Sequence, residues 1–157
     1  MASCKSPSQK GFGLAPPMQP FTDSMDLQAI VSTTSGRILV VDDDEGARNF
    51  IVSSLRADGH DVDASGNGFE ALNLLGRHWY DLIVSDLRMP EVDGPSLYSQ
   101  VTRRWPGSPP HFVFVTGEAN TSDYTGFLKV IHAPVLTKPF KIGALRRVIK
   151  RALRTAA

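Results

Sequence analysis

The sequence lacks the features that mark several common protein classes. Its 157 residues include one cysteine, Cys4, so an internal disulfide framework is excluded and a reducing, cytoplasmic location is expected. No apolar run approaches the roughly 20 residues that a membrane-spanning helix needs, so no membrane insertion is expected. The N-terminus lacks the basic-then-apolar order of a secretion signal.

An excess of one charge is also absent. The net charge is +1, so bulk electrostatics favour neither nucleic acid nor a membrane surface. The hydrophobic fraction of 41% is ordinary for a globular protein, and the length suits one domain with a buried core. Residues 1–35 hold four of the eleven prolines and little apolar material, which predicts a flexible tail or linker before a domain over 36–155. A tether to a larger parent protein is the alternative for this segment.

Four short apolar segments are each followed closely by polar side chains. Their β-branched residues and their length favour buried strands over helices. The segments are 37–41 before the acids 42–45, 82–84 before Asp86, 111–115 before Thr116, and 135–137 before Lys138. In a parallel sheet the carboxyl ends of all four strands lie at one edge.

Helical periodicity fills the gaps between these strands. It predicts helices over 45–58, 68–77, from Pro95 to beyond Val101, 122–131 and 142–153, with a weak strand at 60–64. Phe50, Phe69 and Ile142 are among the side chains expected to face the core. Strands alternating with helices predict an α/β fold, a parallel sheet covered on both faces.

Four motifs in order then point to a family. Val-Val-Asp42-Asp43-Asp, Asp86-Leu-Arg-Met-Pro, Val-Thr116-Gly and Thr-Lys138-Pro-Phe resemble the receiver domain of two-component response regulators, over about 36–154. Each motif alone is weak, but the four together, with family-like separations, are specific. The resemblance implies a flavodoxin-like five-stranded parallel sheet in the order 2-1-3-4-5, with five helices on both faces.

Crowded carboxylates at one edge repel each other unless a cation joins them, and Mg²⁺ prefers oxygen ligands of this kind. The resemblance implies that Asp43, Asp86 and the backbone carbonyl of Arg88 bind Mg²⁺ directly, with Asp42 acting through a water. The alternative is a polar loop, with Asp44 or Glu45 capping the next helix.

The resemblance also implies that Asp86 is a phosphoacceptor and not the nucleophile of a conventional enzyme. Its donor would be the phosphohistidine of a histidine kinase or histidine phosphotransfer protein. Lys138 and Thr116 would neutralise phosphoryl oxygens, and a cis peptide bond is expected at Lys138–Pro139. The alternatives are a turn or cap role for Asp86, a solvated charge for Lys138 and ordinary strand preference for Thr116.

The sequence defines less clearly how a signal would pass from this domain to a partner. Val135 stands where many receivers carry a switch aromatic, so a phosphate relay or sink, as in hybrid histidine kinases, is the alternative function. A downstream partner is expected on the surface of the fourth helix, fifth strand and fifth helix, and a phosphorylation-dependent homodimer remains open. Arg88 and Glu118 would lie at the mouth of the pocket or be solvated charges.

The last helix carries five basic residues, at 146, 147, 150, 151 and 154. They form either a solvated face or a docking patch for an acidic partner. No DNA-binding domain is expected, because the chain has no room for a helix-turn-helix after this helix.

Two rival functions fit less well. A phosphatase of the haloacid dehalogenase type would need a second acid at position 88, where Arg88 stands. A flavin or nucleotide binder would want a glycine-rich loop after the first strand, and the acids at 42–45 occupy that place.

Overall fold

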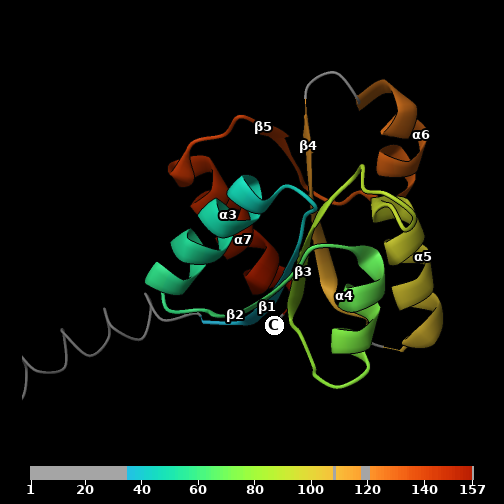
Figure 1. The fold of residues 1–157 in the computed structure, drawn as a ribbon, viewed down its shortest axis with the longest axis horizontal. Coiled ribbons are helices and arrows are strands. Elements are labelled where there is room, and N and C mark those ends of the chain that lie inside the picture. Colours follow the sequence, from blue (N-terminus) through green and yellow to red (C-terminus); the bar gives the residue numbers. More distant parts are fainter. Residues whose placement is uncertain (1–34, 108, 118–120, 157) are drawn as a thin grey trace, which may run out of the picture. The chain divides into compact units, whose positions relative to one another are not determined.

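The computed structural model describes residues 35–107, 109–117 and 121–156. The predicted tail and Glu118 lie outside these residues, so their predictions stay open. Strands and helices alternate along the described chain (Figure 1). In order, with the labels of Figure 1, they are β1 (Arg37–Val41), α3 (Glu45–Ala57), β2 (Asp61–Ser65), α4 (Gly68–Leu75), β3 (Leu82–Asp86), α5 (Gly94–Arg104), β4 (His111–Gly117), α6 (Thr121–Ile131), β5 (Val135–Lys138) and α7 (Ile142–Ala156).

The five strands form one parallel sheet in the order β2-β1-β3-β4-β5, which confirms the predicted topology. The first described strand, β1, lies inside the sheet, the next strand, β2, forms one edge, and β3, β4 and β5 follow on the other side of β1. β1 and β3, which come first and third along the chain, are therefore direct neighbours. This neighbourhood brings the acids after β1 close to Asp86 at the end of β3.

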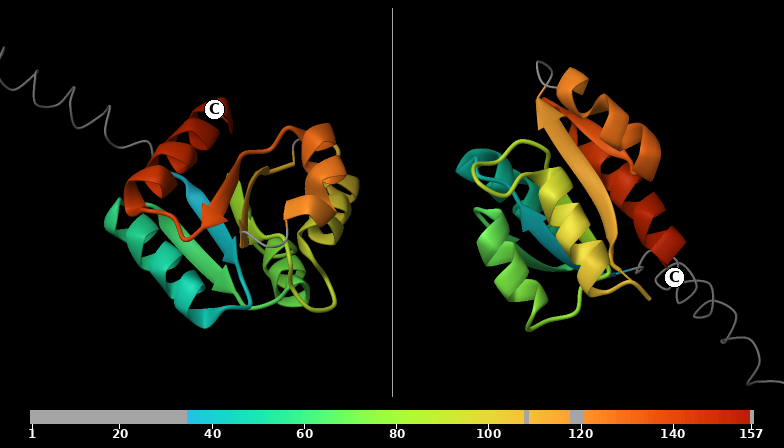
Figure 2. Two further views of the ribbon diagram at one scale, coloured as in Figure 1. Left: turned by 90° about the horizontal axis from the view of Figure 1, so that it is seen from above. Right: turned by 90° about the vertical axis from the view of Figure 1, so that its right-hand side faces the viewer.

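Helices cover both faces of the sheet: α3 and α7 lie on one face, and α4, α5 and α6 lie on the other (Figure 2). Successive residues of β1 alternate between the two cores. Ile38 and Val40 pack with α3 and α7, whereas Leu39 and Val41 pack with α4 and α5, and all four are fully buried. A parallel strand buried on both faces reads as a continuous apolar run, as this one does.

Side-chain caps define where α3 and α5 begin. Asp44 accepts a hydrogen bond from the backbone N–H of Ala47 at 3.1 Å, which confirms its predicted capping role. Asp93 accepts from the N–H of Ser96 at 2.9 Å, and Pro95 occupies the first turn of α5, where its missing N–H costs nothing. The cap at Asp93 therefore fixes where the loop after β3 ends and α5 begins.

Three predicted core positions are wrong, because their side chains are only partly covered. Phe50 is 45% exposed, Phe69 is 55% exposed and Ile142 is 37% exposed. The ring of Phe50 lies beside that of Phe140, with ring centroids 6.1 Å apart. No helix of the described segments is both long enough and apolar enough to cross a membrane.

Candidate functional site

The carboxyl ends of four strands bring the predicted site residues together. Val41 of β1 pairs with Ser85 of β3, so the next residues, Asp42 and Asp86, follow neighbouring strands at the same level. On the other side, Gly117 of β4 pairs with Lys138 of β5. Because the strands are parallel, residues that are far apart in the sequence lie together at one edge of the sheet.

Three carboxylates form the acidic part of this cluster. Asp42 is 1% exposed and Asp86 is 8% exposed, whereas Asp43 is open to solvent. One oxygen from each lies within 4.8 Å of the others. Octahedral Mg²⁺ with bonds of about 2.0–2.1 Å holds its ligand oxygens roughly 3–4 Å apart, so small side-chain rotations would adapt these carboxylates to the ion. The donor set fits Mg²⁺.

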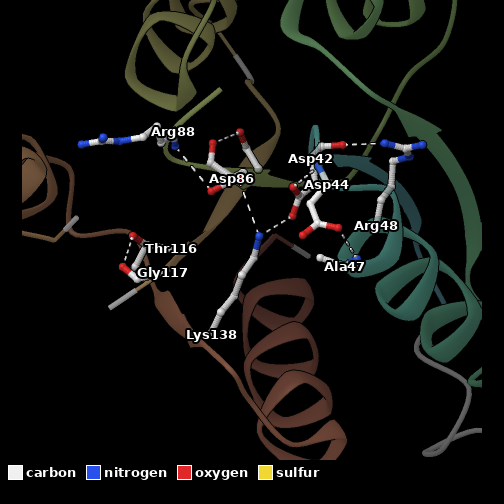
Figure 3. Close-up of polar contacts among 10 residues, drawn as sticks. Asp42, Asp44, Ala47, Arg48, Asp86, Arg88, Thr116, Gly117 and Lys138 are labelled. Atoms are coloured by element: carbon white, nitrogen blue, oxygen red, sulfur yellow. Dashed lines mark hydrogen bonds and ion pairs between the residues drawn. The ribbon is translucent and has the colours of Figure 1, made fainter. Parts of the chain in front are cut away.

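Lys138 supplies the cation within the cluster. Its Nζ lies 2.9 Å from Oδ2 of Asp42 and 3.6 Å from Oδ2 of Asp86, and Figure 3 shows the side chain reaching between the two acids. Burial lowers the pKa of Lys138, but the hydrogen bond to Asp42 and the charge of Asp86 outweigh it, so the net pKa is raised. Lys138 therefore stays charged at neutral pH. The Lys138–Pro139 peptide bond is cis, as the resemblance implied.

The environment of Asp86 disfavours its ionised form. Burial, followed by the negative charge of Asp42, raises the pKa of Asp86 to about 6, and Lys138 opposes this rise only in part. The sequence had predicted that crowded carboxylates hold protons more tightly in the absence of a further cation. A pKa of about 6 still leaves the Asp86 carboxylate mostly ionised at pH 7.

Thr116 lies at the same edge but is not bonded to the acids. It is 1% exposed at the end of β4, and its hydroxyl donates to the carbonyl of Gly117 at 3.1 Å. Figure 3 shows this bond beside the cluster. The neighbouring backbone is tied to the Asp86 loop, because the N–H of Leu87 donates to the carbonyl of Val115 at 2.9 Å.

The loop after Asp86 depends on a glycine at the start of α5. The N–H of Gly94 donates to the carbonyl of Leu87 at 2.9 Å. A Cβ atom at position 94 would lie 2.8 Å from the carbonyl oxygen of Asp86 and 3.0 Å from Cα of Leu87. Only a residue without a side chain fits this close approach.

Two supporting contacts have no signal in the sequence. The guanidinium of Arg48 donates to the backbone carbonyl of Asp42 at 2.8 Å, and the N–H of Asp44 donates to the Asp42 carboxylate at 2.9 Å. Figure 3 shows the Arg88 side chain pointing away from Asp86. Arg88 forms an exposed ion pair with Asp123 of α6, with Nη2 2.9 Å from Oδ2. Its backbone N–H lies 3.4 Å from Oδ1 of Asp86.

Comparisons with known proteins agree with this geometry. A family model described as "response regulator receiver domain" matches residues 38–150. The transcriptional regulatory protein GlrR of Escherichia coli (strain K12) is 32% identical over 127 residues, which are 81% of this chain and 28% of GlrR. The sensor kinase CckA of Brucella abortus (strain 2308) is 32% identical over 122 residues, 76% of this chain and 13% of CckA. This chain therefore spans less than a third of either relative.

A solved structure extends the likeness to three dimensions. The receiver domain of the Francisella response regulator 1452 is 32% identical and superposes with a TM-score of 0.64, over 77% of this chain and 99% of that domain. The described strands and helices thus match a whole solved domain rather than a fragment of one.

Proposed function

This chain belongs to the family of response regulator receiver domains, and from that premise we propose that Asp86 accepts a phosphoryl group from a partner's phosphohistidine. The observation that carries the proposal is the setting of Asp86, a nearly buried carboxylate at a strand end. It stands beside Asp42 and Asp43, with the Lys138 ammonium 3.6 Å away.

The chemistry is a transfer between two nucleophiles. A carboxylate oxygen of Asp86 forms a bond to phosphorus while the phosphorus–nitrogen bond of phosphohistidine breaks, and the imidazole leaves with that electron pair. The product is an acyl phosphate, of the kind that carboxylates form in some ATPases. Such transfers depend mainly on in-line positioning and on neutralising the phosphoryl oxygens.

Side chains of this site would provide that neutralisation. Lys138 exchanges its contact with Asp86 for a phosphoryl oxygen while keeping the 2.9 Å bond to Asp42. Asp42, Asp43, Asp86 and the backbone carbonyl of Arg88 would hold Mg²⁺, which supplies positive charge at a further phosphoryl oxygen when bound.

Thr116 would report the modification to the rest of the domain. Its hydroxyl leaves the Gly117 carbonyl, which lies 3.1 Å away, and donates to the phosphoryl group instead. Because Thr116 is the penultimate residue of β4, the strand that precedes α6 in the chain, this rotation would shift the surface formed by α6, β5 and α7. A local charge change thus biases a two-state element that a downstream partner reads.

Acetyl phosphate provides the direct test, with the product read by intact-protein mass spectrometry. We expect one added phosphoryl group in the presence of Mg²⁺, none in EDTA and none in Asp86→Asn. Glu91→Gln is the matched control, because it removes a carboxylate from the same loop but outside the acidic cluster. An adduct that persists in Asp86→Asn would overturn the assignment, as would a folded wild-type protein that no phosphohistidine or acetyl phosphate donor labels.

A further inference from the structure

A groove of about 720 Å³ lies at the edge of the sheet opposite the carboxylates. Its walls come from the start of β4 and the residues before it, the turn between α6 and β5, and the last turns of α5 and α7. Sites for small molecules commonly have volumes of about 300–1,000 Å³. The groove shares no residue with the proposed phosphorylation site.

The floor of the groove is aromatic and apolar. Phe112, Tyr98 and Ile131 line it, and the rings of Tyr98 and Phe112 meet edge to face with centroids 5.1 Å apart. These rings belong to a larger packed cluster that includes Phe114 and Phe127. The floor is therefore held rigidly. Phe112 is 5% exposed, so the half-buried ring of Tyr98 is the one that offers an open face to a flat ring.

The rim of the groove is basic. Arg151, His111 and His132 line it, and no aspartate or glutamate does so. Among the described residues, the guanidinium of Arg151 has neither an ion pair nor a hydrogen-bond partner. A positive group beside a rigid apolar floor, without a carboxylate of its own, complements a ligand that carries a negative charge.

His132 supports a binding role through its backbone. It follows the last residue of α6 with φ of 55°, in the left-handed region where helices usually end on glycine. Its N–H still donates to the carbonyl of Leu128 at 3.2 Å, so the helix end itself would be equally well formed with glycine. What the histidine adds at this position is an imidazole on the groove wall.

Basic residues near helix C-termini also interact favourably with the helix dipole, which accounts for much of the positive charge on α7. The helix dipole explains neither the groove nor the presence of His132 at a position suited to glycine. We propose that the groove binds a small anionic molecule with a flat aromatic or apolar body. Its anionic group would contact Arg151 and His132, and its body would lie on Tyr98 and Phe112.

The fluorescent dye 1-anilinonaphthalene-8-sulfonate is a suitable probe, because it joins a sulfonate to flat rings. Titration of the full chain should show saturable binding at one site. Arg151→Glu should weaken binding about tenfold or more, since a charge-assisted hydrogen bond is replaced by a repulsion. Lys150→Glu makes the same charge change on the same helix outside the groove, and it should alter binding by less than about twofold.

His132→Gly separates binding from folding. The variant should weaken dye binding severalfold while leaving the melting temperature unchanged or higher, because glycine adopts the left-handed conformation without strain. Backbone amide signals of Thr102, Ile131 and Ala152 should shift on addition of the dye. The proposal fails if no saturable binding occurs, if Arg151→Glu and Lys150→Glu weaken it equally, if His132→Gly leaves it unchanged, or if the shifts gather around exposed Phe50 or Trp79.

Discussion

At the scale of single residues, Asp86 occupies an environment that favours its neutral form. Its pKa is raised from 3.8 to about 6 by burial and by the charge of Asp42. Lys138 offsets only part of this effect, because its ammonium lies nearer to Asp42, at 2.9 Å, than to Asp86, at 3.6 Å. Without a divalent ion, the ionised carboxylate of Asp86 therefore destabilises the folded state at neutral pH.

Asp86→Asn should accordingly raise the free energy of unfolding in EDTA by about 2–3 kcal/mol at about pH 8, because one pKa unit corresponds to about 1.4 kcal/mol and the shift from 3.8 to about 6 already includes the attraction of Lys138. The folded-state pKa lies above the unfolded value of 3.8, so the folded chain binds more protons than the unfolded chain between these two values. The stability contributed by this group is present at low pH and is lost as pH rises through about 6.

Urea unfolding of both proteins in EDTA, at about pH 5 and about pH 8, measures this difference. The advantage of Asp86→Asn should be larger at the higher pH. Glu91→Gln serves as the control, because it removes a charge from the same loop outside the acidic cluster, and its stability relative to wild type should change little between the two pH values. An Asp86→Asn protein that is less stable than wild type at both pH values would contradict the electrostatic account.

At the scale of elements, the junction between β3 and α5 sets the position of Asp86, the proposed acceptor. Gly94→Ala should destabilise the domain by about 1–3 kcal/mol, because its new methyl group overpacks against the backbone of Asp86 and Leu87. It should also slow phosphorylation by acetyl phosphate, since the carboxylate of Asp86 moves with its backbone. Chemical denaturation and the initial rate of adduct formation measure the two effects.

Gly126→Ala provides the matched control for that variant. Gly126 lies inside α6, and a Cβ atom there would meet nothing within 4 Å. Alanine should therefore stabilise the helix by about 0.5–1 kcal/mol and leave the rate of labelling unchanged. If both alanine variants behave alike, the close approach at Gly94 does not position Asp86.

At the scale of the whole described domain, the quality of each sequence prediction follows from burial. β1 was predicted with its observed bounds, because a strand covered on both faces must be apolar throughout. β2 gave only a weak signal, since it lies at the sheet edge and carries Asp61 and Asp63 on partly solvated positions. Phe50 and Phe69 were misplaced because periodicity locates an apolar stripe but not which of its members touch the sheet.

The candidate site likewise has features that the sequence predicts and features that it does not. The meeting of Asp42, Asp86 and Lys138 could be predicted, because parallel strands end at one edge. The distances could not, since they depend on side-chain packing: Lys138 lies closer to Asp42 than to the proposed acceptor. The ion pair between Arg88 and Asp123 joins positions 35 residues apart, and no local sequence pattern predicts it.

The stability of the whole domain should depend on two cations at the acidic cluster, a bound Mg²⁺ ion and the ammonium of Lys138. Mg²⁺ that binds only the folded state stabilises it by RT ln(1 + [Mg²⁺]/Kd), or about 1.4 kcal/mol at ten times Kd. For a chain of this size, that corresponds to a rise in melting temperature of roughly 3–6 °C. We expect this rise for wild type and Glu91→Gln, and a much smaller one for Asp86→Asn, which loses one of three carboxylates.

Lys138→Met sharpens the test, because the internal ammonium and an external ion both neutralise Asp42 and Asp86. Removing the ammonium leaves two nearly buried carboxylates without their cation, so the variant should melt below wild type in EDTA. Mg²⁺ should then raise its melting temperature by more than it raises that of wild type. An equal or smaller rise would mean that Lys138 and the ion do not compensate for the same charges, and that the acidic cluster is not where Mg²⁺ binds.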